Sequence, residues 1–518
     1  MVFRCPICEL RIEGPLRPHI LQMHGEAAFK RAVLTDKERG ISDPEIGARY
    51  GISFNTLQQI ITEAYGANIS VLQRSKTIKR WEPRSFQEET TTVWSFKQRG
   101  DWATHNGRYR GNWSPYIPRN VILKYSRPGD LVLDYFVGGG TTAVEAKLLG
   151  RRCIARDINP GAVGITLENL RFSPPRSLTA EAEPVIYDPE VRIGDARDLS
   201  DIPDNSVDLI CAHPPYAGII RYSTRIPGDL SALSVPDFLR EMRKVAQESL
   251  RVLKPGGKCA ILVGDARRSK NVIPIGFQTI RVFLDTGLVL KELVIKRQHN
   301  CRTTGFWYTR SIQHNFLLLA HEYLPIFEKP LIGEIREQLP LWEESPSCWL
   351  HREAVPEAKK ENLETTTVWI FPEDQLDAEM RRNLIQRFCS GGHFLEVRYG
   401  EKEEWPLDEP PADTLFIRCP PPPMTESRFV GYRGLVVHLA QRSWNWLPPG
   451  AVLIVEAVDF RSGGRLIPSG LLVYEALQGQ RHLSLKEIVI VVPNPPPCPP
   501  SDESLQIIHR YLLIYLRN

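Results

Sequence analysis

The sequence predicts an α/β protein with a Rossmann-like main sheet, a second, degenerate copy of that sheet at the C-terminus, and a small metal-binding and helical head at the N-terminus. Three observations predict this arrangement. Short apolar strands alternate with helical segments over residues 131–211, a cysteine and histidine pattern occupies residues 5–24, and residues 364–371 repeat residues 89–96. Alternation of strands and helices is typical of a parallel sheet that carries ligand-binding residues at its strand ends.

A glycine-rich turn follows the first of these strands. The apolar run at 131–133 leads to Asp134, and three glycines at 138–140 allow the backbone to turn and approach a ligand without a Cβ in the way. A helix is expected after this turn, ending at Gly150. The next strand, 152–157, ends at Asp157, which is placed to accept hydrogen bonds from a ribose. Further strands are expected at 191–195 and 207–211.

Together these segments resemble the DNA amino-methyltransferases, which methylate adenine N6 or cytosine N4. Residues 134–142 resemble their cofactor loop, Asp157 begins a ribose-binding motif, and Asp195 matches the residue that contacts the cofactor adenine. The stretch His213-Pro-Pro-Tyr216 resembles their catalytic tetrapeptide, which usually starts with Asp, Asn or Ser. The resemblance implies S-adenosylmethionine as cofactor, held by Asp134, Phe136, Gly138, Gly140, Thr141, Thr142, Asp157 and Asp195. It implies catalytic roles for His213, Pro214, Pro215 and Tyr216.

The tetrapeptide fits the chemistry of an exocyclic amine, whose lone pair is delocalised into the base. Acceptors around the two N–H bonds favour a pyramidal nitrogen and stabilise the charge that develops. The prolines stiffen the loop, and Tyr216 is expected to stack on a base flipped out of the duplex. The chain departs from the family at His213, which accepts a hydrogen bond only when it is neutral. The alternative is that His213 is a loop residue without a chemical role.

Near the N-terminus, the spacing Cys-x2-Cys-x10-His-x4-His predicts a structural zinc site. Two thiolates and two imidazoles match a closed tetrahedral zinc site and resemble a Cys2His2 zinc finger with a short central spacer. Leu16 is expected to pack inside the finger. The expected ligands are Cys5, Cys8, His19 and His24.

A helix-turn-helix-like region is expected next. Ser42 and the following proline mark a helix start, Gly51 a break, and Ser53 a second start. Two helices joined by a glycine-containing turn resemble a helix-turn-helix. Side chains expected to reach DNA, and the basic residues that follow, are Asn55, Gln58, Gln59, Arg74, Lys76, Lys79 and Arg80. The alternative is a small helical hairpin with a solvated basic tail.

The last third of the chain contains an internal repeat. Seven of eight residues are identical between 89–96 and 364–371, and further matches follow in the same order, such as 290–295 with 485–490. We interpret residues 364–518 as a shortened copy of the same fold. It lacks the glycine loop and an equivalent of Asp157, so it is expected to bind no cofactor. A fused copy of this kind predicts a monomer with an internal pseudo-dimer.

Composition agrees with this organisation. We expect a zinc finger over 1–28, a helix-turn-helix-like region over 29–82, a catalytic domain over 83–330, a linker over 331–363 and the non-catalytic copy over 364–518. Residues 1–130 hold 20 Lys and Arg against 13 Asp and Glu, a net charge of +7, whereas the whole chain carries +4. A basic N-terminal third is typical of proteins that bind a polyanion. No apolar run is long enough to span a membrane, and scattered cysteines favour the cytoplasm.

The sequence therefore predicts a site-specific DNA methyltransferase that uses S-adenosylmethionine and acts on double-stranded DNA. Cytosine N4 is slightly favoured over adenine N6, because non-acidic first residues of the tetrapeptide are commoner among cytosine-N4 enzymes. A cognate restriction endonuclease is a possible partner. Two alternatives stay open: an RNA base methyltransferase, and a DNA-binding regulator that has kept the fold without the activity.

Overall fold

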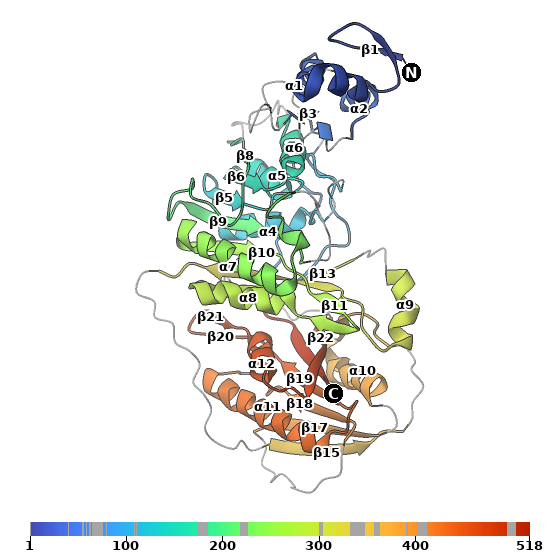
Figure 1. The fold of residues 1–518 in the computed structure, drawn as a ribbon. Coiled ribbons are helices and arrows are strands. Elements are labelled where there is room, and N and C mark those ends of the chain that lie inside the picture. Colours follow the sequence, from blue (N-terminus) through green and yellow to red (C-terminus); the bar gives the residue numbers. More distant parts are fainter. Residues whose placement is uncertain are drawn as a thin grey trace. The chain divides into compact units, whose positions relative to one another are not determined.

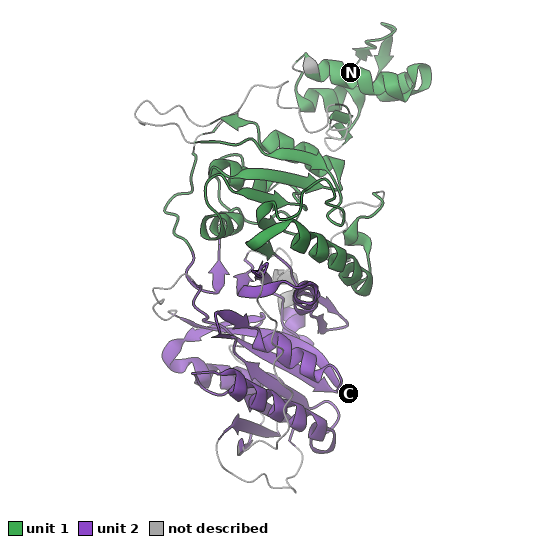
Figure 2. Ribbon diagram, turned by 90° about the vertical axis from the view of Figure 1, so that its left-hand side faces the viewer, with its two compact units in different colours: residues 1–88, 98–261 green, residues 89–97, 262–518 purple. Residues whose placement is uncertain are grey.

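The computed structural model of the chain divides into two compact units. Unit 1 comprises residues 1–88 and 98–261, and unit 2 comprises residues 89–97 and 262–518 (Figure 2). The structure describes residues 2–39, 41–53, 56–57, 60–61, 64, 76–78, 80–107, 109, 111–173, 185–217, 226–299, 304–331, 348–356, 363–389, 392–400, 412–494 and 504–518. Asn55, Gln58, Gln59, Arg74 and Lys79, expected near DNA, lie outside these residues, as does most of the linker at 331–363.

Unit 1 begins with a hairpin and two helices. Strands β1 (Val2–Arg4) and β2 (Arg11–Glu13) pair antiparallel, and α1 (Arg17–Glu38) follows with a break at its internal glycine, Gly25 (Figure 1). Helix α2 (Asp43–Tyr50) starts at the expected cap, where Ser42 and Glu45 form a capping box. It ends at Gly51, whose φ of 66° is left-handed. The first helix of the helix-turn-helix-like region is therefore present as expected.

The core of unit 1 is a run of five parallel strands in the order β8-β6-β5-β9-β10. The strands are β5 (Leu131–Asp134), β6 (Arg152–Asp157), β8 (Glu190–Ile193), β9 (Val207–Ala212) and β10 (Leu253–Ile261). The helices between or beside them are α4 (Tyr116–Tyr125), α5 (Thr141–Leu148), α6 (Pro160–Asn169) and α7 (Val235–Val252). The chain moves outward through β6 and β8, then returns to β9 on the other side of β5. This reversal makes the carboxyl ends of β5 and β9 a switch point, where Rossmann-like sheets bind ligands.

The sheet that contains these strands has the order β4-β13-β14-β10-β9-β5-β6-β8. Its remaining strands are β4 (Val93–Ser95), β13 (Val289–Arg297) and β14 (His321–Glu328). Strand β13 pairs antiparallel with β14 and parallel with β4. Smaller elements are β3 (Lys76–Thr77), β7 (Phe172–Ser173), the 3-10 turn η2 (Leu230–Ala232), β11 (Ala266–Arg268), β12 (Asn271–Ile273), α8 (Ile275–Thr286) and α9 (Thr304–Gln313).

A second sheet of seven strands has the order β15-β17-β18-β19-β23-β22-β16. Its strands are β15 (Cys348–Ala354), β16 (Val368–Pro372), β17 (His393–Tyr399), β18 (Thr414–Arg418), β19 (Val452–Ala457), β22 (Leu483–Asn494) and β23 (Arg510–Arg517). With it are η3 (Glu373–Gln375), α10 (Leu376–Phe388), α11 (Glu426–Trp446), β20 (Phe460–Ser462), β21 (Arg465–Ile467) and α12 (Ser469–Leu477). Its core is apolar, with Trp369, Ile454 and Leu512 fully buried.

The second sheet repeats most of the first. The order β17-β18-β19-β23-β22-β16 in the second sheet matches the order β5-β9-β10-β14-β13-β4 in the first. The strand directions match as well: β22 pairs antiparallel with β23 and parallel with β16, as β13 does with β14 and β4. The described residues contain no counterpart of α5, β6, α6 or β8, and the antiparallel strand β15 lies beside β17 instead. The expected fold class, a Rossmann-like α/β sheet with a degenerate second copy, is confirmed. The domain boundaries stay a prediction. The compact units divide the chain differently, since residues 89–97 and 262–330 belong to the same unit as the second copy.

Within unit 2, the two copies meet through reciprocal ion pairs. The guanidinium of Arg267 binds both oxygens of Glu487 at 3.0 and 2.5 Å, and the equivalent Arg461 binds Glu292. Both carboxylates are buried, with 0% of the Glu487 side chain and 2% of the Glu292 side chain exposed. Such exchange, in which each copy offers the same residues to the other, is the mark of an isologous interface.

The same exchange recurs in the side chains of two buried histidines. His321 Nδ1 lies 2.8 Å from the Thr367 hydroxyl, and His509 Nδ1 lies 2.8 Å from the Thr92 hydroxyl. The repeated segment Glu-Thr-Thr-Thr-Val-Trp supplies both threonines. The residues that recur in the sequence are therefore the residues that each copy offers to the other.

Candidate active site

A pocket lies at the carboxyl ends of β5, β6 and β9 in unit 1. It is therefore at the switch point of the sheet, as expected for a Rossmann-like ligand site. Its wall combines glycine, aromatic and acidic residues: Tyr109, Gly111, Asn112, Trp113, Tyr135, Phe136, Val137, Gly138, Gly139, Asp157, Ile158, Asn159, Asp195, Ala196, His213, Pro215, Gly228, Asp229 and Leu230. The cofactor and catalytic motifs of the sequence thus meet in one cavity.

Asp157 shapes the glycine turn as well as facing the pocket. Its carboxylate accepts the backbone N–H of Gly138 and that of Asn159, each at 2.9 Å. Burial raises the pKa of Asp157 to about 6, against the opposing effect of these two hydrogen bonds. Gly138 has a φ of 53°, a conformation that side chains other than glycine rarely adopt. The sequence analysis did not predict that Asp157 fixes the glycine turn, because no local pattern links its carboxylate to a backbone N–H 19 residues upstream.

Four residues expected to bind cofactor lie behind the pocket wall: Asp134, Gly140, Thr141 and Thr142. Asp134 is buried at the end of β5 and accepts the backbone N–H of Phe136 at 3.0 Å. Burial raises the pKa of Asp134 to about 7. Gly140, with a φ of 82°, precedes the first turn of α5. These residues fix the shape of the loop, while Phe136, Gly138, Asp157 and Asp195 line the cavity.

Asp195 reaches the pocket after β8 and is bound by a single arginine. Arg197 Nε lies 2.9 and 3.1 Å from the two Asp195 oxygens, and its Nη2 lies 2.6 Å from Oδ2. Arg197 Nη1 also contacts Glu241 of α7 at 2.6 Å. The two carboxylates keep the pKa of Arg197 raised above its usual range. Asp195 is thus an acceptor of fixed orientation in the wall of the cavity.

The tetrapeptide at residues 213–216 contributes to the wall of the same pocket. His213 and Pro215 line the cavity, whereas Pro214 and Tyr216 lie outside its wall. The His213 ring stacks on Trp113, with centroids 5.4 Å apart and planes at 23°. His213 Nε2 lies 2.8 Å from the Tyr216 hydroxyl. Trp113 and Tyr216 therefore fix the orientation of the imidazole, and Tyr216 is engaged with His213 here rather than open to a base.

The described residues between 99 and 112, which the sequence analysis did not assign to the site, include Tyr109 and Asn112 beside the glycine turn. A Cβ on Gly138 would come within 2.9 Å of the Tyr109 ring. The segment is anchored on Glu145 of α5, a carboxylate with no exposed surface. Trp102 Nε1 donates to Glu145 at 2.7 Å, and His105 Nε2 lies 2.6 Å from the same oxygen. No local signal could have revealed this anchor, because its members lie about 40 residues apart along the chain.

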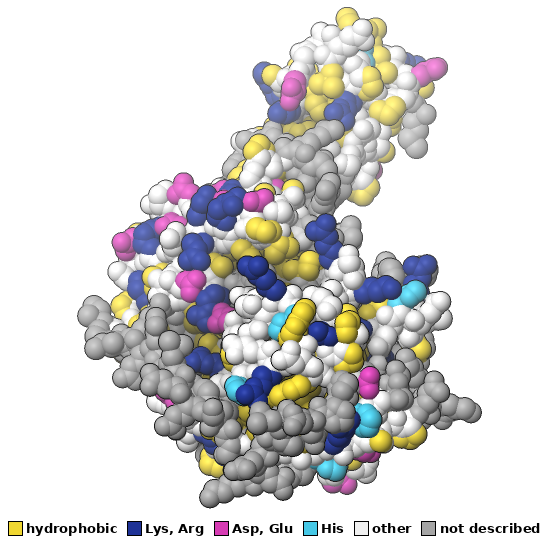
Figure 3. Space-filling model, turned by 60° about the horizontal axis from the view of Figure 1, so that its bottom comes forward, with side chains coloured by type: hydrophobic (Ala, Val, Ile, Leu, Met, Phe, Trp, Pro, Cys, Tyr) yellow, Lys and Arg dark blue, Asp and Glu magenta, His cyan; other side chains and the backbone are white. Residues whose placement is uncertain are grey.

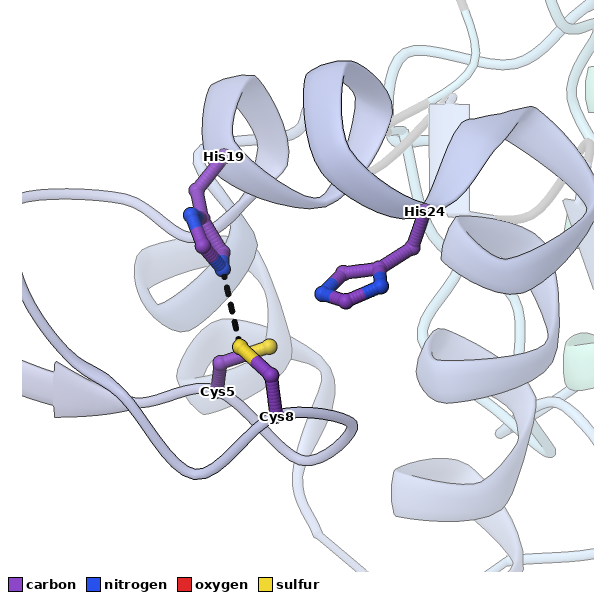
Figure 4. Close-up of side chains that lie close together, drawn as sticks. All are labelled: Cys5, Cys8, His19 and His24. Carbon is purple, nitrogen blue, oxygen red and sulfur yellow. Dashed lines mark hydrogen bonds between the residues drawn. The ribbon is translucent and has the colours of Figure 1, made fainter.

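The four expected zinc ligands gather at the N-terminal hairpin and the start of α1 (Figure 4). One ligand atom from each of Cys5, Cys8, His19 and His24 lies within 4.8 Å of the others. Cys8 Sγ is 3.2 Å from His19 Nε2, and His24 Nε2 is buried with no hydrogen-bond partner among the described residues. A buried imidazole nitrogen without a partner is costly unless a metal binds it. Leu16 is fully buried, as expected.

Comparisons with known proteins agree with the motifs. Residues 59–168 match the family model described as DNA methylase. The type II methyltransferase M.MthZI of Methanothermobacter thermautotrophicus is 29% identical over 30% of this chain and 49% of its own length. M.BglII of Bacillus subtilis is 24% identical over 35% of the chain and 51% of its length. A tRNA (guanine(10)-N2)-dimethyltransferase of M. thermautotrophicus is 38% identical over 21% of the chain and 29% of its length.

The chain spans about half, or less, of the length of these relatives. Among solved structures, a methyltransferase from Methanosarcina mazei is 18% identical with a TM-score of 0.28, covering 41% of this chain and 97% of its own. A DNA modification methylase from Thermus thermophilus, titled as putative, is 27% identical with a TM-score of 0.21, covering 28% of this chain and 53% of its own. The family match includes the glycine turn and Asp157, but not the tetrapeptide. Over residues 59–168, which include the glycine turn and Asp157, the resemblance to the DNA amino-methyltransferases is confirmed.

Proposed function

We propose that the chain transfers a methyl group from S-adenosylmethionine to an exocyclic amine of a base flipped out of DNA, with cytosine N4 favoured over adenine N6. The observation that carries this proposal is the position of His213, in the wall of the same cavity as Asp157 and Asp195. Type II methyltransferases among the relatives support DNA as the substrate and a cognate restriction endonuclease as a partner. The described cysteines form no disulfide with one another, which supports a cytoplasmic location.

The residues of the pocket fit S-adenosylmethionine by their chemistry. The cofactor is a cation with hydroxyl and amine donors, and the wall offers the carboxylates of Asp157 and Asp195. In this account Asp157 accepts from the ribose and Asp195 from the adenine amine. When bound, the cofactor supplies an electrophilic methyl group. The chain contributes position and polarity, which account for much of the rate in such reactions.

The tetrapeptide would then act on the base. The unprotonated nitrogen of a neutral His213 imidazole would accept a hydrogen bond from one N–H of the base's exocyclic amine. Pro214 and Pro215 would keep the loop rigid, so that a backbone carbonyl can accept a hydrogen bond from the second N–H. Tyr216 would leave the His213 ring and stack on the base. The stacked Trp113 would keep the imidazole in place when Tyr216 moves.

Cofactor binding gives a first prediction. Asp157→Ala should weaken S-adenosylmethionine binding by about 1–3 kcal/mol, the range for hydrogen bonds to a charged group. The loss should lie at the upper end, because the carboxylate also holds the Gly138 backbone. Calorimetry measures the affinity, and Asp204→Ala, outside the pocket wall, serves as the matched control. If the wild-type chain binds no cofactor, the enzyme proposal is wrong.

The N-terminal head would bind zinc and DNA. Cys5, Cys8, His19 and His24 would hold a structural zinc ion, and the charge of the N-terminal third would provide phosphate contacts. On the face drawn in Figure 3, described Lys and Arg side chains lie scattered among acidic and apolar ones. No helix of the described residues is long and apolar enough to cross a membrane.

Removal of the head gives a second prediction. A chain lacking residues 1–80 should bind DNA more weakly and with a flatter salt dependence, because phosphate contacts release counterions. Cofactor binding should survive, since no residue of the pocket wall is removed. Elemental analysis should find about one zinc per full-length chain, as a closed four-ligand site requires. A full-length chain without zinc would refute the metal site, and unchanged DNA affinity after truncation would refute the role of the head.

One observation favours a second candidate, an RNA base methyltransferase. The relative that acts on tRNA, by its name, shares 38% identity over 109 residues. A flipped base in RNA presents the same amine to the same loop. Methyl transfer from labelled cofactor to duplex DNA or to tRNA separates the two. We expect label in duplex DNA, and label confined to tRNA would make the second candidate correct.

A further inference from the structure

A turn that the motifs do not include forms part of the pocket wall. Gly228, Asp229 and Leu230 line the cavity, and they lie in the chain between the tetrapeptide at 213–216 and α7. Asp229 brings a third carboxylate to a cavity that already contains Asp157 and Asp195. Neither the glycine turn nor the tetrapeptide accounts for it.

The turn is held in place by Arg197. Besides binding Asp195, Arg197 Nη2 donates to the Gly228 carbonyl at 3.1 Å. Gly228 has a φ of 87°, and a Cβ there would lie 2.5 Å from Arg197 Nη2 and 3.1 Å from Ile158. Only glycine fits this close approach without displacing the arginine. The turn is thus fixed by the same guanidinium that fixes Asp195.

The Asp229 carboxylate is itself oriented. Its Oδ1 accepts the backbone N–H of Ser231 at 2.8 Å, at the start of η2. Burial is the main cause of the raised pKa of Asp157, and the charge of Asp229 is a further cause. The two carboxylates therefore lie near each other in the cavity. Two carboxylates of like charge placed together in a cavity repel each other unless they share a donor-rich or cationic ligand.

A ribose has two vicinal hydroxyls, and both need acceptors. Each oxygen of Asp157 already accepts one backbone N–H, from Gly138 or from Asn159. A carboxylate offers about four acceptor positions, so Asp157 can still take one hydroxyl well, but a second one would compete with the N–H that fixes the glycine turn. Asp229, on the turn that Arg197 holds, is the acceptor the pocket offers for the other hydroxyl.

We propose that Asp229 is a second cofactor-binding carboxylate, which accepts a hydrogen bond from one ribose hydroxyl of S-adenosylmethionine while Asp157 accepts one from the other. This inference rests on the proposed function. The two carboxylates make the pocket selective for a nucleoside with an intact ribose.

The test uses the full-length chain and calorimetry with S-adenosylhomocysteine and its 2′-deoxy and 3′-deoxy ribose analogues. Wild type should bind each deoxy analogue about 10- to 100-fold more weakly than the parent compound, because each lacks a hydrogen bond to a charged group. Asp229→Asn should bind the parent about tenfold more weakly, and should show no further loss for one of the two analogues. The other analogue should still be discriminated, through Asp157.

Asp198→Asn is the matched control. Asp198 makes the same local turn, in which Oδ1 accepts the backbone N–H two residues ahead, but it lies outside the pocket wall. It should behave as wild type with all three compounds. If Asp229→Asn binds like wild type, or discriminates both analogues as wild type does, the second-carboxylate inference is overturned while the proposed function stands. A wild-type chain that binds no S-adenosylhomocysteine would overturn both.

Discussion

Replacing His213 by alanine should lower the rate of methyl transfer by about 10²–10³-fold, the loss seen when one preorganised polar group is removed from a reacting centre. The imidazole lines the pocket and is held between Trp113 and Tyr216, so its nitrogen has a fixed direction. Single-turnover kinetics with labelled cofactor and duplex DNA measure the rate of the chemical step without product release.

Two comparisons make this prediction specific. His213→Asp restores the residue that the family commonly uses and should keep most of the activity, whereas the cofactor affinity of both variants should equal that of wild type. Unchanged turnover in His213→Ala would show that the side chain has no catalytic part. Activity lost equally in His213→Asp would show that the loop needs the imidazole for packing against Trp113 rather than for its acceptor.

Removing Arg267 should destabilise unit 2 by about 3–5 kcal/mol, the cost of leaving a buried charge without its partner. The Glu487 side chain has no exposed surface, and Arg267 binds both of its oxygens. Burial raises the pKa of Glu487, and the guanidinium opposes that shift. Arg461→Ala should cost a similar amount, because Arg461 binds the buried Glu292 in the equivalent way. Urea unfolding followed by circular dichroism measures both.

Arg481→Ala is the control, since Arg481 is exposed on the same unit and surface changes usually stay within about 0.5 kcal/mol. The double variant Arg267→Ala with Glu487→Gln should recover part of the loss, because no buried charge is then left. A loss below about 1 kcal/mol for both arginines would contradict the reciprocal interface as a source of stability, since it falls well short of the range for a broken buried pair.

The sequence predicted the sheet well because its signals are local. The run at 131–133 is apolar and ends before three glycines, and β5 and the left-handed glycines at 138 and 140 lie there. The repeat was equally informative. Two segments with nearly identical residues fold alike, so β4 and β16 take equivalent edge positions in the two sheets.

The site was predicted less completely because its remaining parts depend on distant contacts. Glu145 looked like an ordinary helix residue, yet it anchors Trp102 and His105. Asp229 belongs to no motif, and its turn is bound by Arg197, which lies 31 residues before Gly228 in the sequence. A spacing rule finds residues that act near one another in sequence, and these partners do not.

Mass analysis of nucleosides from the DNA of a host that expresses the chain shows whether the protein methylates DNA, and on which base. We expect N4-methylcytosine in that DNA, and none above background in the same host expressing the His213→Ala variant. N6-methyladenine in its place would correct the favoured base and keep the reaction. DNA without any methylated amino group, from cells that contain folded, cofactor-binding chain, would contradict the claim that this protein is a DNA amino-methyltransferase.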